Sequence, residues 1–212
     1  MKVLLVNGSP HKNGCTFTAL KEIEKTLNSE GIDAEIFWIG NKPISGCIAC
    51  LACSSGAGKC VCGEDVNIFR EKAKESDGFI FGSPVHYASI SGALSSFMDR
   101  LFYSDSGAYG GETFRLKPAA GIISARRGGT TASFDRINKY FTINEMPVIS
   151  SRYWNMVHGT NPEEVLQDKE GLFTMRVLAK NMAYHLKCKE AALKAGITPP
   201  EKEEPVRTNF IR

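Results

Sequence analysis

Five of the seven cysteines fall within sixteen residues, and this segment carries the most distinctive chemistry of the chain. Cys47, Cys50 and Cys53 follow one another with two residues between them, and Cys60 and Cys62 come shortly after. Three thiols on one tight turn can bind a soft metal or an iron–sulfur cluster, and the same spacing suits a thiol–disulfide pair. Taken alone, the segment leaves cluster, zinc and redox-active thiol chemistry open.

The composition places the chain among ordinary globular proteins and excludes several functional classes. Its 212 residues include 42% hydrophobic and 23% charged residues, enough for one sizeable core. A net charge of +3 without a basic block indicates neither nucleic acid nor an anionic membrane as a partner. No apolar run reaches the roughly 18 residues of a membrane span. We expect a cytoplasmic protein, where a cysteine cluster binds metal or is redox-active rather than forming a disulfide framework.

Apolar runs that end at Gly, Ser or Pro alternate along the chain with amphipathic segments. The run before Gly8-Ser9-Pro10 suits a strand buried on both faces, and the next segment repeats apolar residues at spacings of three and four. Such alternation predicts a parallel sheet with helices on both faces. The expected strands are residues 2–6, 34–39, 78–82, 118–125 and 147–151, and the clearest helices are 16–28, 65–75 and 162–195.

Several smaller features complete the expected organisation of the chain. Residues 1–198 form one domain, and the charged, proline-bearing residues 199–212 form a non-helical C-terminal extension. The glycine-rich stretch 104–112 is expected to be an excursion loop, and Gly171 to mark a turn in the last helical stretch. Asp65 is a candidate helix cap, and Cys188 is expected to be a buried apolar residue.

Three of the expected strands end in loops with polar or glycine-rich character. Ligands of an open parallel sheet bind at the carboxyl ends of its strands. In the first loop, the hydroxyls of Ser9 and Thr16 and a helix N-terminus are suited to a phosphate monoester. This loop is neither a Walker loop nor a G-x-G-x-x-G motif, which disfavours a nucleoside triphosphate or a Rossmann dinucleotide.

The second loop is suited to a flat heterocycle, and the third to close backbone contact with a ligand. After the third strand, Pro84 fixes the backbone and places His86 and Tyr87 at the sheet edge. After the fourth, residues 124–131 contain small residues that let the backbone approach a ligand closely. Arg126 and its neighbour Arg127 are either an anion site for a nicotinamide cofactor or a solvated pair.

Together these loops resemble the flavodoxin-like NAD(P)H-dependent FMN reductase family over roughly residues 2–151. The resemblance rests on Gly8-Ser9-Pro10 with Gly14 and Thr16, on Gly82-Ser83-Pro84-Val85 with Gly92 and Asp99-Arg100, and on Ser124-Ala125 through Thr130. His11 and Cys15 stand where the family usually has arginine and asparagine. The resemblance implies a doubly wound five-stranded sheet of order 2-1-3-4-5. It implies FMN bound by Ser9, His11, Gly14, Cys15, Thr16, Pro84, Val85, His86, Tyr87, Ser124, Ala125, Arg126, Gly128 and Gly129.

The cysteine pattern is similar to that of the iron–sulfur flavoproteins within this family. Their motif is C-x2-C-x2-C followed a few residues later by a fourth cysteine, which Cys47, Cys50, Cys53 and Cys60 match. The resemblance implies a [4Fe-4S] cluster that relays single electrons. Relatives without a cluster also carry cysteines here, so free thiols and zinc stay open, and Cys62 is an extra thiol.

The expected activity is electron transfer from NAD(P)H or a reduced carrier to a quinone-like or one-electron acceptor. The flavin performs this chemistry while the protein holds and tunes it. His86 is the candidate proton donor beside the ring. The alternatives are a metal-free FMN or quinone reductase and a flavodoxin-type electron-transfer protein without NAD(P)H activity. The expected partners are a small redox molecule or a carrier protein, with a homodimer or homotetramer implied by the family.

Overall fold

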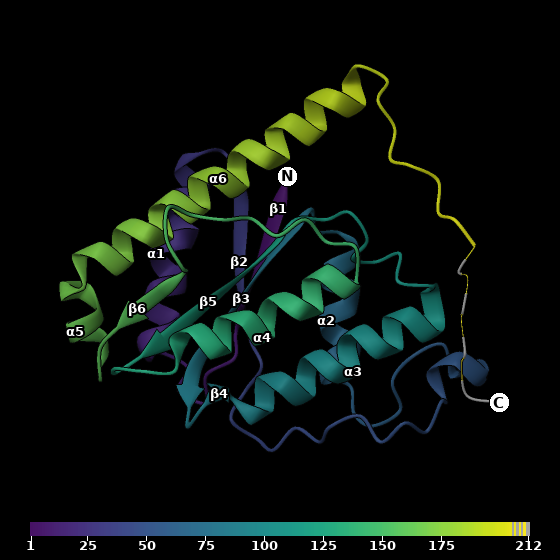
Figure 1. Cartoon of the computed structure of the whole chain (residues 1–212), viewed down its shortest axis with the longest axis horizontal. Coiled ribbons are helices and arrows are strands. Elements are labelled where there is room, and N and C mark those ends of the chain that lie inside the picture. Colours follow the sequence, from purple (N-terminus) through teal and green to yellow (C-terminus); the bar gives the residue numbers. More distant parts are fainter. Residues whose placement is uncertain (205, 207, 209, 211–212) are drawn as a thin grey trace.

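Six strands form one sheet in the computed structural model, which describes residues 1–204, 206, 208 and 210 (Figure 1). Five of them are parallel and follow the order β2-β1-β3-β5-β6, which is the expected 2-1-3-4-5 order of a flavodoxin-like sheet. The short β4 pairs antiparallel with the end of β3. The strands are β1 (Lys2–Asn7), β2 (Asp33–Trp38), β3 (Gly78–His86), β4 (Ser89–Ile90), β5 (Ala119–Ala125) and β6 (Met156–His158).

Alternate residues of the central strands serve two separate cores. On β1, Val3 and Leu5 join one core cluster, and Leu4 and Val6 join the other. Successive side chains of a strand point to opposite faces, so a strand covered on both sides must be apolar throughout. This explains the unbroken apolar run at the start of the chain and confirms the expected α/β class.

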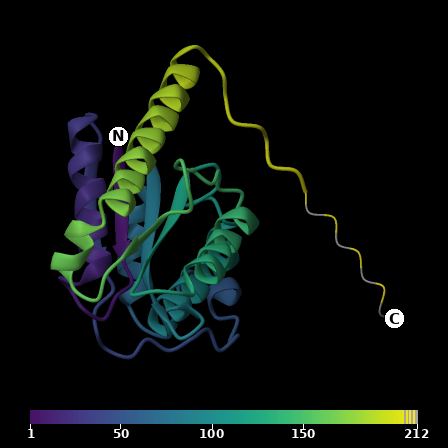
Figure 2. The ribbon, with the colours of Figure 1, turned by 60° about the vertical axis from the view of Figure 1, so that its left-hand side comes forward.

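The helices cover both faces of this sheet. Helix α1 (Cys15–Ser29) packs with α5 (Pro162–Gln167) and α6 (Lys169–Lys194) on one face. Helices α2 (Asp65–Lys74), α3 (Gly92–Tyr109) and α4 (Thr130–Ile143) cover the other face. Figure 2 shows α1 and α6 side by side, with α3 and α4 across the sheet from them. A short π-helical turn, η1 (Cys53–Ala57), lies in the cysteine segment.

The last parallel strand lies further along the chain than expected. Residues 147–151 make only a single bridge, Ala119 to Val148, and the strand β6 begins at Met156. At three residues, β6 is too short to show a strand pattern in the sequence. The later start brings Gly159 and the residues after it to the carboxyl edge of the sheet, where β5 also ends.

Four further expectations were also wrong, three about helices and one about the burial of Cys188. Helix α3 continues to Tyr109, so most of the stretch 104–112 is helical, because Ser104 and Asp105 belong to its buried face. The last helical stretch breaks at Asp168 instead of Gly171, since the Asp168 carboxylate accepts the Gly171 backbone N–H. Asp65 is the first residue of α2 and makes no cap hydrogen bond. Cys188 is exposed.

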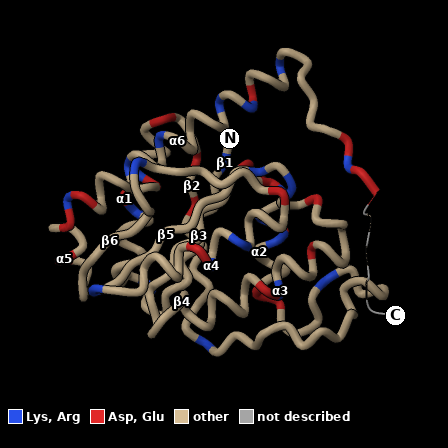
Figure 3. The backbone as a smooth tube through the Cα atoms, in the orientation of Figure 1, with Lys and Arg blue, Asp and Glu red and all other residues tan. Residues whose placement is uncertain are grey.

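Basic and acidic residues are interspersed along the backbone (Figure 3). No helix in the described part of the chain has both the length and the apolar composition needed to cross a bilayer. Residues 197–204 lack regular secondary structure, and the expectation for the extension at 205, 207, 209, 211 and 212 lies outside the described residues.

Candidate functional site

The three loops identified from the sequence meet in one open cleft of about 770 Å³ at the carboxyl edge of the sheet. This volume lies within the range of small-molecule and cofactor sites. Eleven of the fourteen expected FMN residues line it, namely Ser9, His11, Gly14, Cys15, Thr16, Pro84, Val85, His86, Ser124, Ala125 and Arg126. The expectation that parallel strand ends bring these loops together is therefore confirmed for the loops as a group.

The loop before α1 presents a helix N-terminus to the cleft. Gly14 precedes the helix in an extended conformation, no side chain caps it, and its first turn has no acidic residue. The buried Ser9 shapes the loop, because its hydroxyl accepts the His11 backbone N–H at 3.2 Å. The Trp38 indole N–H donates to the Ser9 carbonyl at 2.8 Å. Backbone donors and the positive end of the helix dipole thus face the cleft, which fits an anionic phosphate.

The hydroxyls of Thr16 and Ser124 join the first loop to the third. Their oxygens lie 2.8 Å apart, and both residues are almost fully buried. Thr16 therefore has a structural bond in addition to its place in the cleft lining. The interpretation of Thr16 as a residue that only contacts a ligand missed this bond.

Tyr87, Gly128 and Gly129 are not among the residues that line the cleft, so their assignment as FMN-binding residues stays a prediction. The tight turn between β3 and β4 gives Tyr87 a positive φ of 54° and exposes its side chain fully. Gly129 begins α4 with φ 93° and packs behind the cleft against Val85. His86 lines the cleft and its side chain is exposed.

A fourth segment, residues 159–162, completes the cleft and was not expected from the sequence. It follows the short β6, whose position was misassigned. The Cys15 thiol contacts the Gly159 carbonyl at 3.6 Å and so bridges this segment and α1. Burial, with a smaller contribution from Glu164 and Glu163, raises the pKa of the Cys15 thiol.

All five clustered cysteines line a second, much smaller cavity of about 20 Å³. Cys47 and Cys50 are exposed, Cys53 is buried, and Cys60 and Cys62 are half-buried. Ala49 and Leu51 take the left-handed backbone conformation, with φ values of 51° and 60°, which winds the loop tightly around its thiols. Arg100, Tyr103 and Ser104 of α3 form the opposite wall. We call this set of five cysteines and Arg100 the thiol centre.

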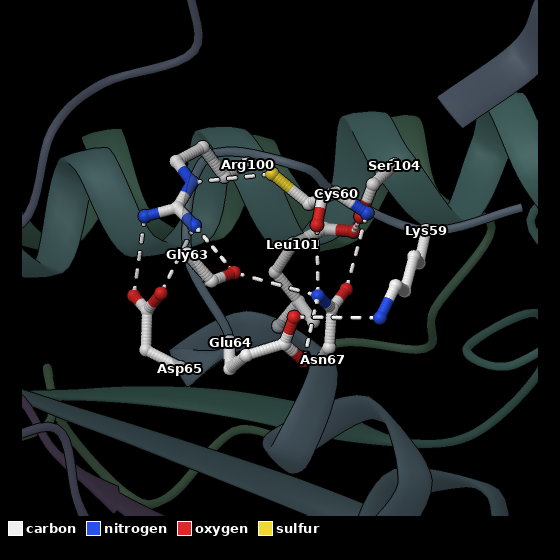
Figure 4. Close-up of polar contacts among 9 residues, drawn as sticks. All are labelled: Lys59, Cys60, Gly63, Glu64, Asp65, Asn67, Arg100, Leu101 and Ser104. Carbon is white, nitrogen blue, oxygen red and sulfur yellow. Dashed lines mark hydrogen bonds and ion pairs between the residues drawn. The ribbon is translucent and has the colours of Figure 1, made fainter. Parts of the chain in front are cut away.

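Cys60 is the most firmly held thiol of this centre (Figure 4). Its backbone N–H donates to the Asn67 side-chain oxygen at 3.1 Å, and its carbonyl accepts from the Asn67 amide at 2.8 Å. The Arg100 Nε–H donates to its sulfur at 3.3 Å. Asp65 accepts from both terminal nitrogens of Arg100, at 2.9 and 3.3 Å. Burial lowers the pKa of Arg100, but hydrogen bonds to Cys60 and Asp65 outweigh it and hold the pKa above its ordinary value.

In the sequence, Asp99-Arg100 belongs to the motif that starts at Gly82. In the structure, Arg100 lies apart from the other residues of that motif that line the cleft. It lines the thiol cavity and is absent from the lining of the FMN-sized cleft. Helix α3 follows β4 directly and reaches Arg100 nine residues after its cap, Ser91, which is about 13 Å along the axis. The cleft and the thiol centre have no lining residue in common.

The thiol centre offers the ligand type that an iron–sulfur cluster needs. Its cavity, however, is smaller than such a cluster. Four or five thiols facing one space supply the ligands that iron–sulfur clusters use. Within the described residues, however, no three Cys, His, Asp or Glu side chains are grouped so that they could hold a metal ion. Residues 41–50 form no helix or strand. To admit a cluster, this loop, which carries Cys47 and Cys50, would have to move away from the other three thiols.

Comparison with known proteins found similar chains whose names refer to flavins. The chain is 32% identical over 192 residues to an iron–sulfur flavoprotein of Methanocaldococcus jannaschii, covering 86% of this chain and 96% of that protein. It is 32% identical over 136 residues to an FMN-dependent NADPH-azoreductase of Staphylococcus saprophyticus, covering 63% and 64%. The solved structure of RosB with a bound riboflavin-phosphate intermediate has the same fold, with a TM-score of 0.68, 14% identity and coverage of 100% and 92%.

The family model of NADPH-dependent FMN reductases matches residues 1–161, which include all four segments of the cleft except its last residue, Pro162, and all five clustered cysteines. The phosphate-type loop, the ring-sized cleft and this match agree on one assignment. The chain belongs to the NADPH-dependent FMN reductase family of flavoprotein oxidoreductases.

Proposed function

We propose that this protein binds FMN in the cleft and transfers electrons from NAD(P)H to a second acceptor by way of the thiol centre. The observation that carries the proposal is the cleft itself, in which an uncapped helix N-terminus and three strand-end loops face one cofactor-sized space. The phosphate would lie against the loop from Ser9 to Thr16. The ring would lie between residues 84–86 and 124–126.

Bound FMN supplies the hydride and single-electron chemistry that no side chain of the cleft offers. The residues of the chain bind and orient it. The backbone N–H groups at the start of α1 hold the phosphate charge, and Thr16 and Ser124 keep two of the loops in register. His86 at the rim would hold or release a proton at the ring edge. Arg126, which also lines the cleft, would meet an anionic group of the nicotinamide donor.

For the thiol centre we propose a four-iron, four-sulfur cluster held by Cys47, Cys50, Cys53 and Cys60. The support is the shared cavity of these thiols, the matching motif and the similarity to an iron–sulfur flavoprotein. Such a cluster handles single electrons, which suits a carrier protein or a one-electron acceptor. A partner of this kind, and the homodimer or homotetramer that the family resemblance implies, remain part of the proposal.

A second candidate is a metal-free NAD(P)H-dependent FMN or quinone reductase. It is favoured by the small size of the cavity that the five thiols share, about 20 Å³. In that case the thiols would be free or would cycle as disulfides. Similarity to the azoreductase fits this candidate as well.

Anaerobic rapid mixing of FMN-loaded protein with NADH or NADPH tests the proposed donor. We expect the flavin absorbance to bleach within one turnover, faster with one of the two nucleotides. As a control, dithionite should bleach the same sample. Bleaching by dithionite without any by NADH or NADPH would contradict the NAD(P)H-dependent activity and would favour a flavodoxin-type carrier instead.

A further inference from the structure

Arg100 is buried with its whole guanidinium engaged, and one of its contacts is a sulfur. It is 2% exposed, and its Nε–H points at the Cys60 sulfur at 3.3 Å. The terminal nitrogens are fixed by the Asp65 carboxylate and by the Gly63 carbonyl at 3.0 Å. Because a guanidinium is planar, fixing its two terminal nitrogens also fixes the direction of its Nε–H. The sulfur contact is therefore built into the fold by residues from α2, from α3 and from the loop that precedes α2 (Figure 4).

The same contacts distinguish Cys60 from its neighbour Cys62. Both thiols line the cavity, and either would complete a four-cysteine set with Cys47, Cys50 and Cys53. Only at Cys60 do a backbone clamp, through Asn67, and a charged donor to the sulfur converge. A thiol held in advance at a cavity wall loses less freedom when it binds a metal group than a thiol without such a clamp.

We propose that Arg100 is the positioning residue of the thiol centre, holding Cys60 in place of Cys62 as the fourth cluster ligand and raising the reduction potential of the bound cluster. This inference rests on the cluster assigned in the proposed function. Reduction adds negative charge to a cluster, and N–H donors or cations at its sulfurs stabilise that charge. Arg100 does not line the FMN cleft, so the potential of the flavin serves as an internal reference.

The test uses the full chain, prepared or reconstituted anaerobically, in the variants Arg100→Gln and Arg100→Lys with Arg70→Gln as the matched control. Arg70 is an equally buried arginine of α2 that donates to the Gly58 carbonyl of the same loop at 3.2 Å and stacks on Tyr109. Iron content and the midpoint potentials of cluster and flavin are measured in each. Retention of FMN reports whether each variant is folded.

We expect Arg100→Gln to lower the cluster potential, or to lose iron where Arg100→Lys keeps it, while the flavin potential stays unchanged. Arg70→Gln should resemble the wild type in iron content and cluster potential. Equal iron content and cluster potential in Arg100→Gln and Arg70→Gln would overturn the inference while leaving the cluster intact. A wild-type protein that takes up no iron would overturn the cluster and this inference together.

The ligand choice is tested separately with Cys60→Ser and Cys62→Ser. We expect Cys60→Ser to lose most of its iron and Cys62→Ser to keep wild-type iron. The reverse pattern, or equal loss in both variants, would overturn the preference for Cys60.

Discussion

The hydroxyl oxygens of Thr16 and Ser124 lie 2.8 Å apart, although the two residues are 108 positions apart in the sequence. One begins the helix that follows β1, and the other lies in β5. Their bond ties the start of α1 to the end of β5, and both residues line the cleft. Cofactor binding and fold stability should therefore depend on the same pair.

Replacing Thr16 with valine tests this link. The isosteric Thr16→Val leaves the buried Ser124 hydroxyl without its partner, so the free energy of unfolding should fall by about 1–3 kcal/mol. FMN affinity, measured by quenching of flavin fluorescence, should fall with it. Thr16→Ser should restore most of both. In a double-mutant cycle, the double variant Thr16→Val, Ser124→Ala should lose less stability than the two single variants lose together. Strict additivity would show that the bond contributes little.

Gly128 and Gly129 offer a matched pair of substitutions next to the cleft. A Cβ on Gly129 would lie 2.8 Å from Val85, and the backbone there has φ 93°, so Gly129→Ala should cost about 1–2 kcal/mol of stability and displace Val85 into the cleft. Gly128 has open space around a Cβ position, and Gly128→Ala should be near neutral. Thermal unfolding and FMN titration of both variants measure the difference. Equal effects would contradict this packing.

The Cys15 thiol reports directly on occupancy of the cleft. Burial raises its pKa, so it should react with iodoacetamide more slowly at neutral pH than an unburied thiol and faster as the pH rises. Bound FMN should protect it further. Cys188 is exposed and far from the cleft lining, so it should label equally with and without FMN. Peptide mapping by mass spectrometry separates the two. Unchanged labelling of Cys15 on saturation with FMN would place the cofactor elsewhere.

Glu35 should make stability depend on acidity. Hydrogen bonds from Lys2 and Lys72, both at 2.7 Å, hold the pKa of Glu35 below its ordinary value. The folded state therefore binds fewer protons than the unfolded one. The contribution of Glu35 to stability is complete above the ordinary pKa of a glutamate. It disappears as the pH falls through the lower pKa that Glu35 has in the folded state. Because the pair is partly exposed, Glu35→Gln should cost under about 1 kcal/mol at neutral pH and nothing in strong acid. A constant cost across that range in urea denaturation would contradict the assignment.

The sequence was sufficient to place the cleft because its signals are local. Each of the first three loops follows an apolar strand, and parallel strands bring their carboxyl ends to one edge. The segment 159–162 was missed because the three-residue β6 is too short to show a period. The exposure of Tyr87 was not expected, because it depends on a tight turn between β3 and β4 that no turn motif in the sequence marks.

For the thiol centre, the sequence predicted which cysteines lie together but not the side chain that contacts them. The five cysteines are close in sequence, so their association was evident. The contact of Cys60 with Arg100 joins residues 40 positions apart and depends on how α3 packs beside the loop. Helix α3 was also expected to end before 104, which would have removed Ser104 from that wall. Long-range side-chain contacts of this kind require the folded structure.

The central claim is that one chain holds a flavin in its cleft and a cluster in its thiol centre. The most direct measurement is the visible absorption spectrum of anaerobically purified protein, with FMN, iron and acid-labile sulfide assayed in the same sample. We expect flavin bands on a broad absorbance that bleaches on reduction, with iron lost in Cys50→Ser while FMN is kept. Flavin bands without iron or sulfide would contradict the cluster, and absence of flavin after incubation with FMN would contradict the cleft assignment.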